Sequence, residues 1–325
     1  MTKAIQIHQQ GGPEQMRWED VIVPAPGPDE ALIRQTAVGL NFIDVYHRSG
    51  VYPLPKFPSS LGSEGAGVVE AVGANVRDVV VGDRVAYAGG PIGAYAERRV
   101  VPAGRLVVLP EAISERQAAA MMLQGLTSQY LLRSTYRVQP GDVILFHAAA
   151  GGVGLIACQW AKYLGATVIG TVGSPAKAAL ARAHGVDHVI DYTKEDFVAR
   201  VKDITGGRGV PVVYDSVGKD TFEGSLDCLR PRGLMVTFGN SSGVVPPFSP
   251  GILSAKGSLY LTRPTLASYT ATRAELLANA AELFDVVAKG AVKIEINQTY
   301  PLAEAAQAHR DLEARKTTGS TVFIV

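Results

Sequence analysis

A glycine-rich turn between an apolar strand and an apolar helix constrains the fold of this chain more than any other feature. Residues 142–146 read DVILF, residues 147–154 read HAAAGGVG, and residues 152–164 have the composition of an apolar helix. From Ala149 onward the turn follows the pattern A-x-G-x-x-G, whose glycines permit a tight turn, close approach to a pyrophosphate and close packing of helix on strand. The helix N-terminus would face the phosphates. The turn therefore predicts a dinucleotide site formed by Gly151, Gly152, Val153 and Gly154.

Strand-like and helix-like segments alternate around and beyond this turn. Strands are predicted at 142–147, 167–172, 188–190, 210–214, 233–238 and 257–263, and helices at 152–164, 175–184, 195–205 and 221–229. Ser174 followed by Pro175 predicts a helix start. Ser114 with Gln117 predicts a capping box for an earlier helix that runs to about Leu123. Such alternation is typical of βαβ units around a doubly wound parallel sheet, with the ligand at the carboxyl ends of the strands.

The segments before this region and after it have a different pattern. Short strands and turns are predicted at 31–38, 65–73 and 79–87, with a helix near 42–49, and the C-terminal part predicts helices at 271–289 and 303–315 and a strand at 321–325. An irregular, partly antiparallel β-domain fits this pattern. We therefore predict an α/β chain in which 1–124 form a mostly-β domain to which 266–325 return, while 125–265 form a Rossmann domain.

Composition restricts the class of protein. The chain has 325 residues, a formal net charge of +1 and 47% hydrophobic residues, which is enough for the core of two domains. The balanced charge argues against a nucleic-acid binder and against binding to an anionic membrane surface. Cys158 and Cys228 are too few for a disulfide framework. With no signal-peptide pattern and no apolar run of about 20 residues, we expect a soluble, cytoplasmic protein.

The second strand of the alternating region indicates which dinucleotide binds. An NAD site has an acidic residue there that bonds the ribose 2′-hydroxyl. This chain has TVGS at 171–174, without an acid, and Lys177 follows. A cation suits a 2′-phosphate, and the Tyr192 hydroxyl could bond the same group, although Lys177 could also be a solvated surface residue. We therefore predict NADPH rather than NADH.

The motifs taken together resemble those of one family. They are the segments 141–145 and 149–154 with Gln159 and Lys162, the segment NFIDVY at 41–46 with RSG at 48–50, and FGNSSG at 238–243. With these motifs the chain resembles the zinc-free medium-chain dehydrogenases and reductases over its whole length. Within them it is similar to bacterial NADPH:quinone oxidoreductases and ζ-crystallin. The resemblance implies a GroES-like catalytic domain, a Rossmann NADPH-binding domain and a homodimer.

The resemblance also implies which residues contact the cofactor. On the nicotinamide side it implies Phe42, Ile43, Asp44, Val45, Tyr46, Thr127 and Tyr130. For the adenosine phosphate it implies Gly173, Ser174, Pro175, Ala176, Lys177 and Tyr192. Ser216 would meet the ribose, Phe238, Gly239, Asn240, Ser241 and Ser242 would cover the nicotinamide half, and Arg315 would add a second cation. Arg315 could instead be a solvated charge in the last turn of a helix.

The chain departs from the zinc-dependent relatives at their metal ligands. Asn41 stands where those enzymes have a cysteine, and the stretch Gly62-Ser63-Glu64 stands where they have Gly-His-Glu. Their four-cysteine structural loop is missing as well. Since zinc needs three or four nitrogen, sulfur or oxygen ligands, we predict no metal.

Without a Lewis acid to polarise a carbonyl, an easily reduced acceptor is the best substrate. A quinone, which can accept hydride or single electrons, comes first, and a conjugated enal, enone or enoyl thioester comes next. The candidate catalytic donors are Asn41, Tyr46 and Tyr52, which could bond the substrate oxygen where charge develops. The alternatives are that Tyr46 packs on the cofactor and that Tyr52 is an ordinary exposed loop residue.

Other assignments stay open. We expect a structural role for His147 over acid–base chemistry, because no paired carboxylate or nucleophile accompanies it. The spacing of residues supports no Ser-His-Asp arrangement. A non-catalytic NADPH- or RNA-binding protein is a less favoured alternative. The segment Gly257–Arg263 predicts an edge strand that could pair across a two-fold axis in a homodimer.

Overall fold

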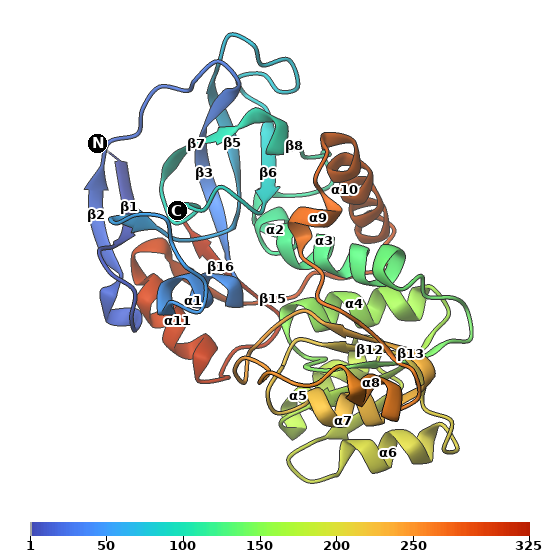
Figure 1. Cartoon of the computed structure of the whole chain (residues 1–325). Coiled ribbons are helices and arrows are strands. Elements are labelled where there is room, and N and C mark those ends of the chain that lie inside the picture. Colours follow the sequence, from blue (N-terminus) through green and yellow to red (C-terminus); the bar gives the residue numbers. More distant parts are fainter. Residues whose placement is uncertain (1) are drawn as a thin grey trace. The chain divides into compact units, whose positions relative to one another are not determined.

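The computed structural model describes residues 2–325 and divides the chain into two compact units (Figure 1). The first contains the chain up to Leu126 together with Tyr269–Ala288 and Ile294–Val325. The second contains Thr127–Ser268 and Lys289–Lys293. The assignment of these units as a catalytic and a cofactor-binding domain stays a prediction.

Two sheets form the centre of the first unit. The larger has the strand order β15-β16-β3-β5-β6-β8, with β7 paired to β3, and the smaller has the order β2-β1-β4. Their bounds are β1 Thr2–Ile7, β2 Arg17–Val21, β3 Glu30–Leu40, β4 Ser59–Ser60, β5 Glu64–Val72, β6 Arg84–Ala88, β7 Arg98–Pro102, β8 Val107–Val108, β15 Ile296–Pro301 and β16 Ser320–Ile324. The pairs are antiparallel except for β15 with β16. Strand β16 lies beside β3 (Figure 1), so the predicted return of the C-terminal strand is confirmed, whereas the sequence did not predict β15.

The strands of this unit enclose a continuous apolar core. Alternating residues of β3 such as Ala31 and Ile33 are buried, as expected of a strand with one face on the core. Ile5, Tyr95 and Phe323 pack into the same cluster. The helices of the unit are α1 Phe42–Ser49, α2 Glu115–Ala119, α10 Arg273–Ala288 and α11 Ala305–Glu313, with short turns η1 Pro13–Gln15, η2 Ala103–Arg105 and η4 Leu302–Glu304.

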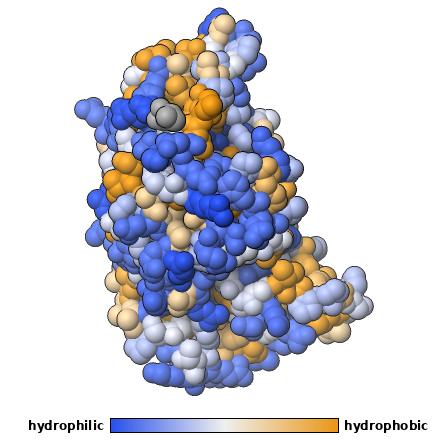
Figure 2. All heavy atoms as spheres, turned by 90° about the vertical axis from the view of Figure 1, so that its left-hand side faces the viewer, coloured by the Kyte–Doolittle hydropathy of each residue, from blue (hydrophilic) through white to orange (hydrophobic). Residues whose placement is uncertain are grey.

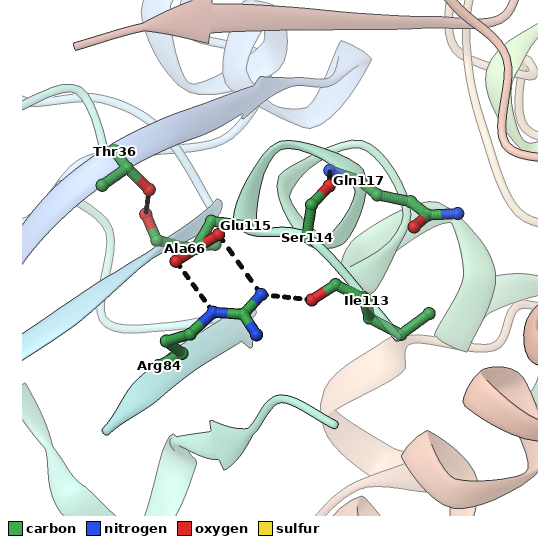
Figure 3. Close-up of polar contacts among 7 residues, drawn as sticks. All are labelled: Thr36, Ala66, Arg84, Ile113, Ser114, Glu115 and Gln117. Carbon is green, nitrogen blue, oxygen red and sulfur yellow. Dashed lines mark hydrogen bonds and ion pairs between the residues drawn. The ribbon is translucent and has the colours of Figure 1, made fainter. Parts of the chain in front are cut away.

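Helix α2 begins as predicted but ends early. The Ser114 hydroxyl accepts a bond from the Gln117 amide at 3.2 Å, and Arg84 of β6 bonds both the Glu115 carboxylate, at 2.9 Å, and the carbonyl oxygen of Ile113 (Figure 3). The expected continuation to Leu123 is wrong, since α2 ends at Ala119 and a separate helix, α3 Met122–Tyr130, follows. The Ser320 hydroxyl of β16 donates to the Ala120 carbonyl at 2.7 Å. In a continuous helix this carbonyl would accept a bond from the main-chain amide four residues further along the chain.

The second unit contains one parallel sheet with the strand order β11-β10-β9-β12-β13-β14. Its strands are β9 Val143–Phe146, β10 Thr167–Val172, β11 His188–Asp191, β12 Val210–Asp215, β13 Leu229–Thr237 and β14 Tyr260–Thr262. The connecting helices are α4 Gly152–Tyr163, α5 Pro175–Ala183, α6 Phe197–Ile204, α7 Phe222–Asp227 and α8 Gly251–Ala255. A π-helical turn, η3 Leu131–Thr135, precedes the sheet, and the short helix α9 Leu266–Tyr269 follows it. The predicted doubly wound Rossmann architecture is confirmed, and β14 is an edge strand.

The order of these strands fixes the position of a ligand site. From β9 the chain proceeds outward through β10 to β11, and then returns to place β12 on the other side of β9. Every residue of β12 is buried, as expected for a central parallel strand. Ligands of open α/β sheets bind at the carboxyl ends of the strands where the order reverses, which here are the ends of β9 and β12.

Within residues 2–325 no helix is both long enough and apolar enough to cross a bilayer. The face drawn in Figure 2 is mostly hydrophilic, with the hydrophobic residues in separate patches.

Candidate active site

The glycine turn connects the end of β9 to the start of α4 in the second unit. The amide of Gly151 donates to the Ala148 carbonyl at 2.9 Å, and α4 starts at Gly152 without a side-chain cap on Gly151. The first amides of a helix have no partner within the helix. This N-terminus therefore presents main-chain donors and the positive end of the helix dipole, which suit a phosphate.

The third glycine of the turn is required by sterics. A Cβ atom on Gly154 would lie 2.4 Å from the Ala148 carbonyl oxygen and 2.8 Å from the Cα atom of Ala149. Both neighbours are main-chain atoms and cannot move aside. At residue 154, helix α4 therefore packs directly against the main chain of the turn that precedes it.

The predicted phosphate-binding group gathers at the ends of β10 and β11. The Tyr192 amide donates to the Val172 carbonyl at 3.1 Å, and a Cβ atom on Gly173 would lie 2.5 Å from the Tyr192 hydroxyl. Ser174 caps α5 by accepting a bond from the Lys177 amide at 3.3 Å, with Pro175 and Ala176 in the first turn. The structure thus brings Gly173 to Lys177 together with Tyr192, while their contact with a cofactor stays a prediction.

The loops after β12 and β13 contact each other. The Ser216 carbonyl accepts a bond from the Ser241 amide at 3.2 Å and would lie 2.5 Å from a Cβ atom on Gly239. Arg263 donates to the Gly239 carbonyl at 3.1 Å, so it supports the segment Phe238–Ser242 from beside the edge strand. The sequence does not predict this role of Arg263, because a supporting arginine that follows an edge strand has no local pattern.

Helix α3 reaches the glycine turn. The Ser128 hydroxyl donates to the Val153 carbonyl at 3.4 Å, and Ser128 lies between the predicted nicotinamide-side residues Thr127 and Tyr130. Both of these predicted residues are buried.

Asn41 lies in a buried polar cluster of the first unit. Its side-chain nitrogen donates to Glu64 at 2.7 Å, and its side-chain oxygen accepts from Gln124 at 3.1 Å. Only 5% of Asn41 is exposed. At least one N–H of the amide is therefore bonded to a carboxyl group of the protein, and the proposed role of Asn41 toward a substrate stays a prediction.

Two carboxyl groups are fully buried in this cluster. Asp44 accepts bonds from the Asn41 amide at 2.9 Å, the Ser63 hydroxyl at 2.9 Å and the Tyr95 hydroxyl at 3.1 Å. Burial raises the pKa of Asp44 to about 7 and that of Glu64 to about 8. The Asp44 side chain thus faces the interior of the unit, and the predicted contact of this residue with the cofactor stays a prediction.

The predicted tyrosines form an aromatic group on helix α1, which contains Tyr46, and just after it, where Tyr52 lies. The rings of Tyr46 and Tyr52 pack edge to face with centroids 5.3 Å apart, and the Phe42 ring lies 6.2 Å from that of Tyr46. Tyr46 is 8% exposed. Gln10 donates to the Tyr52 carbonyl at 2.9 Å and to the His47 carbonyl at 3.0 Å, which fixes the start of the loop. No local pattern predicts this role of Gln10, since Gln10 is 42 residues from Tyr52.

Arg315 follows α11 in the first unit. It adopts the left-handed conformation, with φ 58°, and its amide donates to the Leu312 carbonyl at 3.0 Å. Its predicted contact with the cofactor stays a prediction.

The side chains at the positions of the relatives' zinc ligands do not fit that metal. The side-chain amide of Asn41 is bonded to Glu64 and Gln124, and the Ser63 hydroxyl donates to Asp44. Neither group is a zinc ligand of the usual Cys or His type. Throughout the described residues, 2–325, no three or more His, Cys, Asp or Glu side chains are arranged to hold a metal ion.

Comparisons with known proteins identify the family. The "Alcohol dehydrogenase GroES-like domain" family model matches residues 27–111, and the "Zinc-binding dehydrogenase" family model matches residues 152–284. The chain is 60% identical to a quinone oxidoreductase of Pseudomonas aeruginosa, with 100% of both chains covered. It is 47% identical to a 2-haloacrylate reductase of a Burkholderia species, covering 100% of this chain and 99% of that one. The crystal structure of Escherichia coli quinone oxidoreductase complexed with NADPH matches with 52% identity and a TM-score of 0.98, covering 99% of this chain and 100% of that one.

The fold, the glycine turn and these full-length similarities agree. The chain belongs to the quinone oxidoreductase family of the medium-chain dehydrogenases and reductases.

Proposed function

We propose that this protein reduces quinones with NADPH and without a metal ion. The observation that carries the proposal is its full-length similarity, at 52% identity, to an E. coli quinone oxidoreductase whose structure is described as complexed with NADPH. The glycine turn independently supports a dinucleotide, because α4 presents main-chain amides without a side-chain cap.

The residues present fit the phosphorylated cofactor. The turn from Gly151 to Gly154 would hold the pyrophosphate at the α4 N-terminus. The group of Ser174, Lys177 and Tyr192 offers hydroxyls and a cation to the 2′-phosphate, and there is no carboxylate at 171–174 to repel it. The segment Phe238–Ser242, supported by Arg263, would cover the nicotinamide half.

When bound, NADPH supplies the hydride. The protein's part is to orient the cofactor and the acceptor and to stabilise charge on the acceptor oxygen. Asn41, Tyr46 and Tyr52 are the proposed donors to that oxygen. The Tyr52 loop is anchored by Gln10, which would limit the freedom of this donor.

A second candidate is the reduction of a conjugated carbon–carbon double bond. The similarity to a 2-haloacrylate reductase at 47% identity favours it, since that name denotes an activated alkene as substrate. Hydride would then add at the β-carbon, and the same donors would bond the carbonyl or carboxylate oxygen.

One experiment separates the two candidates. The purified protein is mixed with NADPH and, in separate reactions, with quinones, enals, enones and 2-haloacrylate, and loss of the reduced nicotinamide absorbance is followed. Faster turnover of quinones supports the first candidate, and faster turnover of the alkenes supports the second. No turnover of any acceptor despite tight NADPH binding would support a non-catalytic NADPH-binding protein.

We propose further that the protein is a homodimer formed through β14. This edge strand pairs only with β13 in the second unit, and Tyr260 at its start is 63% exposed. An open strand edge can pair with a second copy across a two-fold axis. Sedimentation at micromolar concentration should give a dimer that Leu261→Pro dissociates, whereas a monomeric unmodified protein would refute the proposal.

We propose a cytoplasmic location on the basis of the cysteines. Cys158 and Cys228 are both free thiols and both buried. Proteins of oxidising compartments more often carry disulfides. Cell fractionation that finds the protein outside the cytoplasm would refute this.

A further inference from the structure

A buried hydrogen-bond network lies at the carboxyl ends of the second unit's central strands, next to the glycine turn. His147, which follows β9, has Nδ1 2.9 Å from the Thr171 hydroxyl of β10 and Nε2 3.0 Å from the Ser225 hydroxyl of α7. Ser225 in turn donates to Oδ2 of Asp215, at the end of β12, at 2.9 Å. His147, Asp215 and Ser225 are all 0% exposed.

The bonds to Asp215 determine where the protons lie. Asp215 also accepts from the Thr221 hydroxyl at 2.7 Å and from the amides of Val217 and Gly218 at 2.7 and 3.0 Å. All four of these groups donate to the Asp215 carboxyl group, so the Ser225 proton points to Asp215. The Ser225 oxygen then accepts from Nε2 of His147. Burial lowers the pKa of His147, so the ring is neutral and Nδ1 accepts from the Thr171 hydroxyl, which leaves a single tautomer.

This network is not a nucleophile with its base. Serine, histidine and aspartate meet here, which spacing did not predict. In a hydrolytic triad, however, the histidine accepts the serine proton and the aspartate bonds the histidine. Here the serine hydroxyl donates to the aspartate, and all three side chains are inaccessible to solvent. The network therefore has the geometry of a structural support and not of a catalytic triad.

The residue that follows His147 is conformationally strained. Ala148 has φ 54°, in the left-handed region that alanine rarely adopts. Its carbonyl accepts the Gly151 amide at 2.9 Å, so its conformation sets the shape of the turn. Main-chain bonds fix both neighbours, from the His147 amide to Tyr214 at 3.0 Å and from the Ala149 amide to Thr171 at 3.0 Å. Such strain persists where the surroundings over-determine it.

We propose that His147 is a positioning residue for the cofactor pyrophosphate, because its buried bonds to Thr171 and Ser225 hold Ala148 in the left-handed conformation that shapes the glycine turn. The same network orders the loop after β12, since Asp215 bonds the amides that follow Ser216. One network thus joins the two loops at the reversal of strand order. This inference rests on the proposed binding of NADPH.

A double-mutant cycle tests it. His147→Phe keeps a flat ring but removes both polar bonds, and Ala148→Gly adopts a positive φ without strain. We expect His147→Phe to weaken NADPH binding about tenfold, a usual size for the coupling of adjacent residues, with kcat at saturating NADPH little changed. In the Ala148→Gly background the same change should weaken binding much less, because glycine no longer needs the histidine.

The controls separate positioning from stability. Val201→Ala removes buried volume from α6 in the same unit and should lower the melting temperature with no change in NADPH affinity. If His147→Phe does not fold, Thr171→Val, which removes one bond at nearly constant shape, should weaken binding in the same direction. Unchanged affinity in the folded variants, or equal losses with and without the Ala148→Gly change, would overturn the inference alone. Failure of the unmodified protein to bind NADPH would overturn the proposed function and the inference with it.

Discussion

The side-chain nitrogen of Asn41 lies 2.7 Å from Oε2 of Glu64, so Asn41 donates a hydrogen bond to a buried carboxyl group. Asn41→Ala removes this donor and a partner of Gln124. We expect the free energy of unfolding to fall by about 1–3 kcal/mol, the usual cost of leaving a buried polar group unpaired. Urea denaturation measures it. Asn297→Ala, which removes an exposed bond to Thr318, should cost far less, and equal losses would contradict the argument.

The buried carboxyls make stability depend on pH in a defined direction. The pKa of Glu64 is raised from 4.5 to about 8 and that of Asp44 from 3.8 to about 7, in both cases mainly by burial. The folded protein thus holds protons that the unfolded chain has released. Unfolding then releases protons, and stability falls as pH rises from about 4.5 to about 8. Glu64→Gln should flatten this decline in denaturation curves measured across that range.

A control of opposite sign is available on the surface. The pKa of Glu275 is lowered by its bond to the Thr272 amide, so its contribution is present above its unfolded pKa and lost as pH falls. Glu275→Gln should therefore lower stability at neutral pH and not at acid pH. The same pH slope in Glu64→Gln as in the unmodified protein would show that Glu64 is ionised when folded.

Local patterns were sufficient to predict much of the fold. The glycine turn, the alternation of strands and helices and the Ser174 cap each involve residues within a few positions of one another. The cap, for example, joins Ser174 to the Lys177 amide. Such features follow from backbone geometry and propensity, which the sequence displays directly.

Features that depend on distant residues could not be predicted. Helix α2 ends at Ala119, and the Ala120 carbonyl that follows it accepts a bond from Ser320, 200 residues away. The buried cluster around Asp44 includes Tyr95 and His309, which are 214 residues apart and 3.0 Å from each other. The bonding of Asn41 to Glu64 likewise requires two strands and a helix to meet, so no local pattern predicts it.

Gly154→Ala tests the close packing of α4. The added Cβ atom would lie 2.4 Å from the Ala148 carbonyl oxygen, and the main chain would have to move. We expect a loss of about 1–3 kcal/mol in stability, typical of overpacking, together with loss of NADPH binding in a fluorescence titration. Gly104→Ala, at a glycine with open space around it, should change neither quantity.

Lys177→Ala tests the choice between the two cofactors. A charge-assisted bond contributes about 1.5–3 kcal/mol, so NADPH should bind roughly ten- to a hundredfold more weakly while NADH binding stays the same. Tyr192→Phe should act in the same direction with a smaller effect. Lys202→Ala, an exposed lysine on α6, serves as the charge-matched control. Equal weakening of NADPH and NADH by Lys177→Ala would refute the assignment of the 2′-phosphate site.

Tyr46→Phe and Tyr52→Phe separate a hydroxyl that donates a proton from a ring that packs. The two rings contact each other edge to face, so a phenylalanine at either position keeps the packing and removes only the hydroxyl. If one hydroxyl protonates the reduced acceptor, its removal should lower kcat about 100-fold with the KM for NADPH unchanged. Tyr163→Phe, at an exposed tyrosine on α4, should leave kcat unchanged. Full activity in both variants would leave hydride transfer to depend on the orientation of cofactor and acceptor alone.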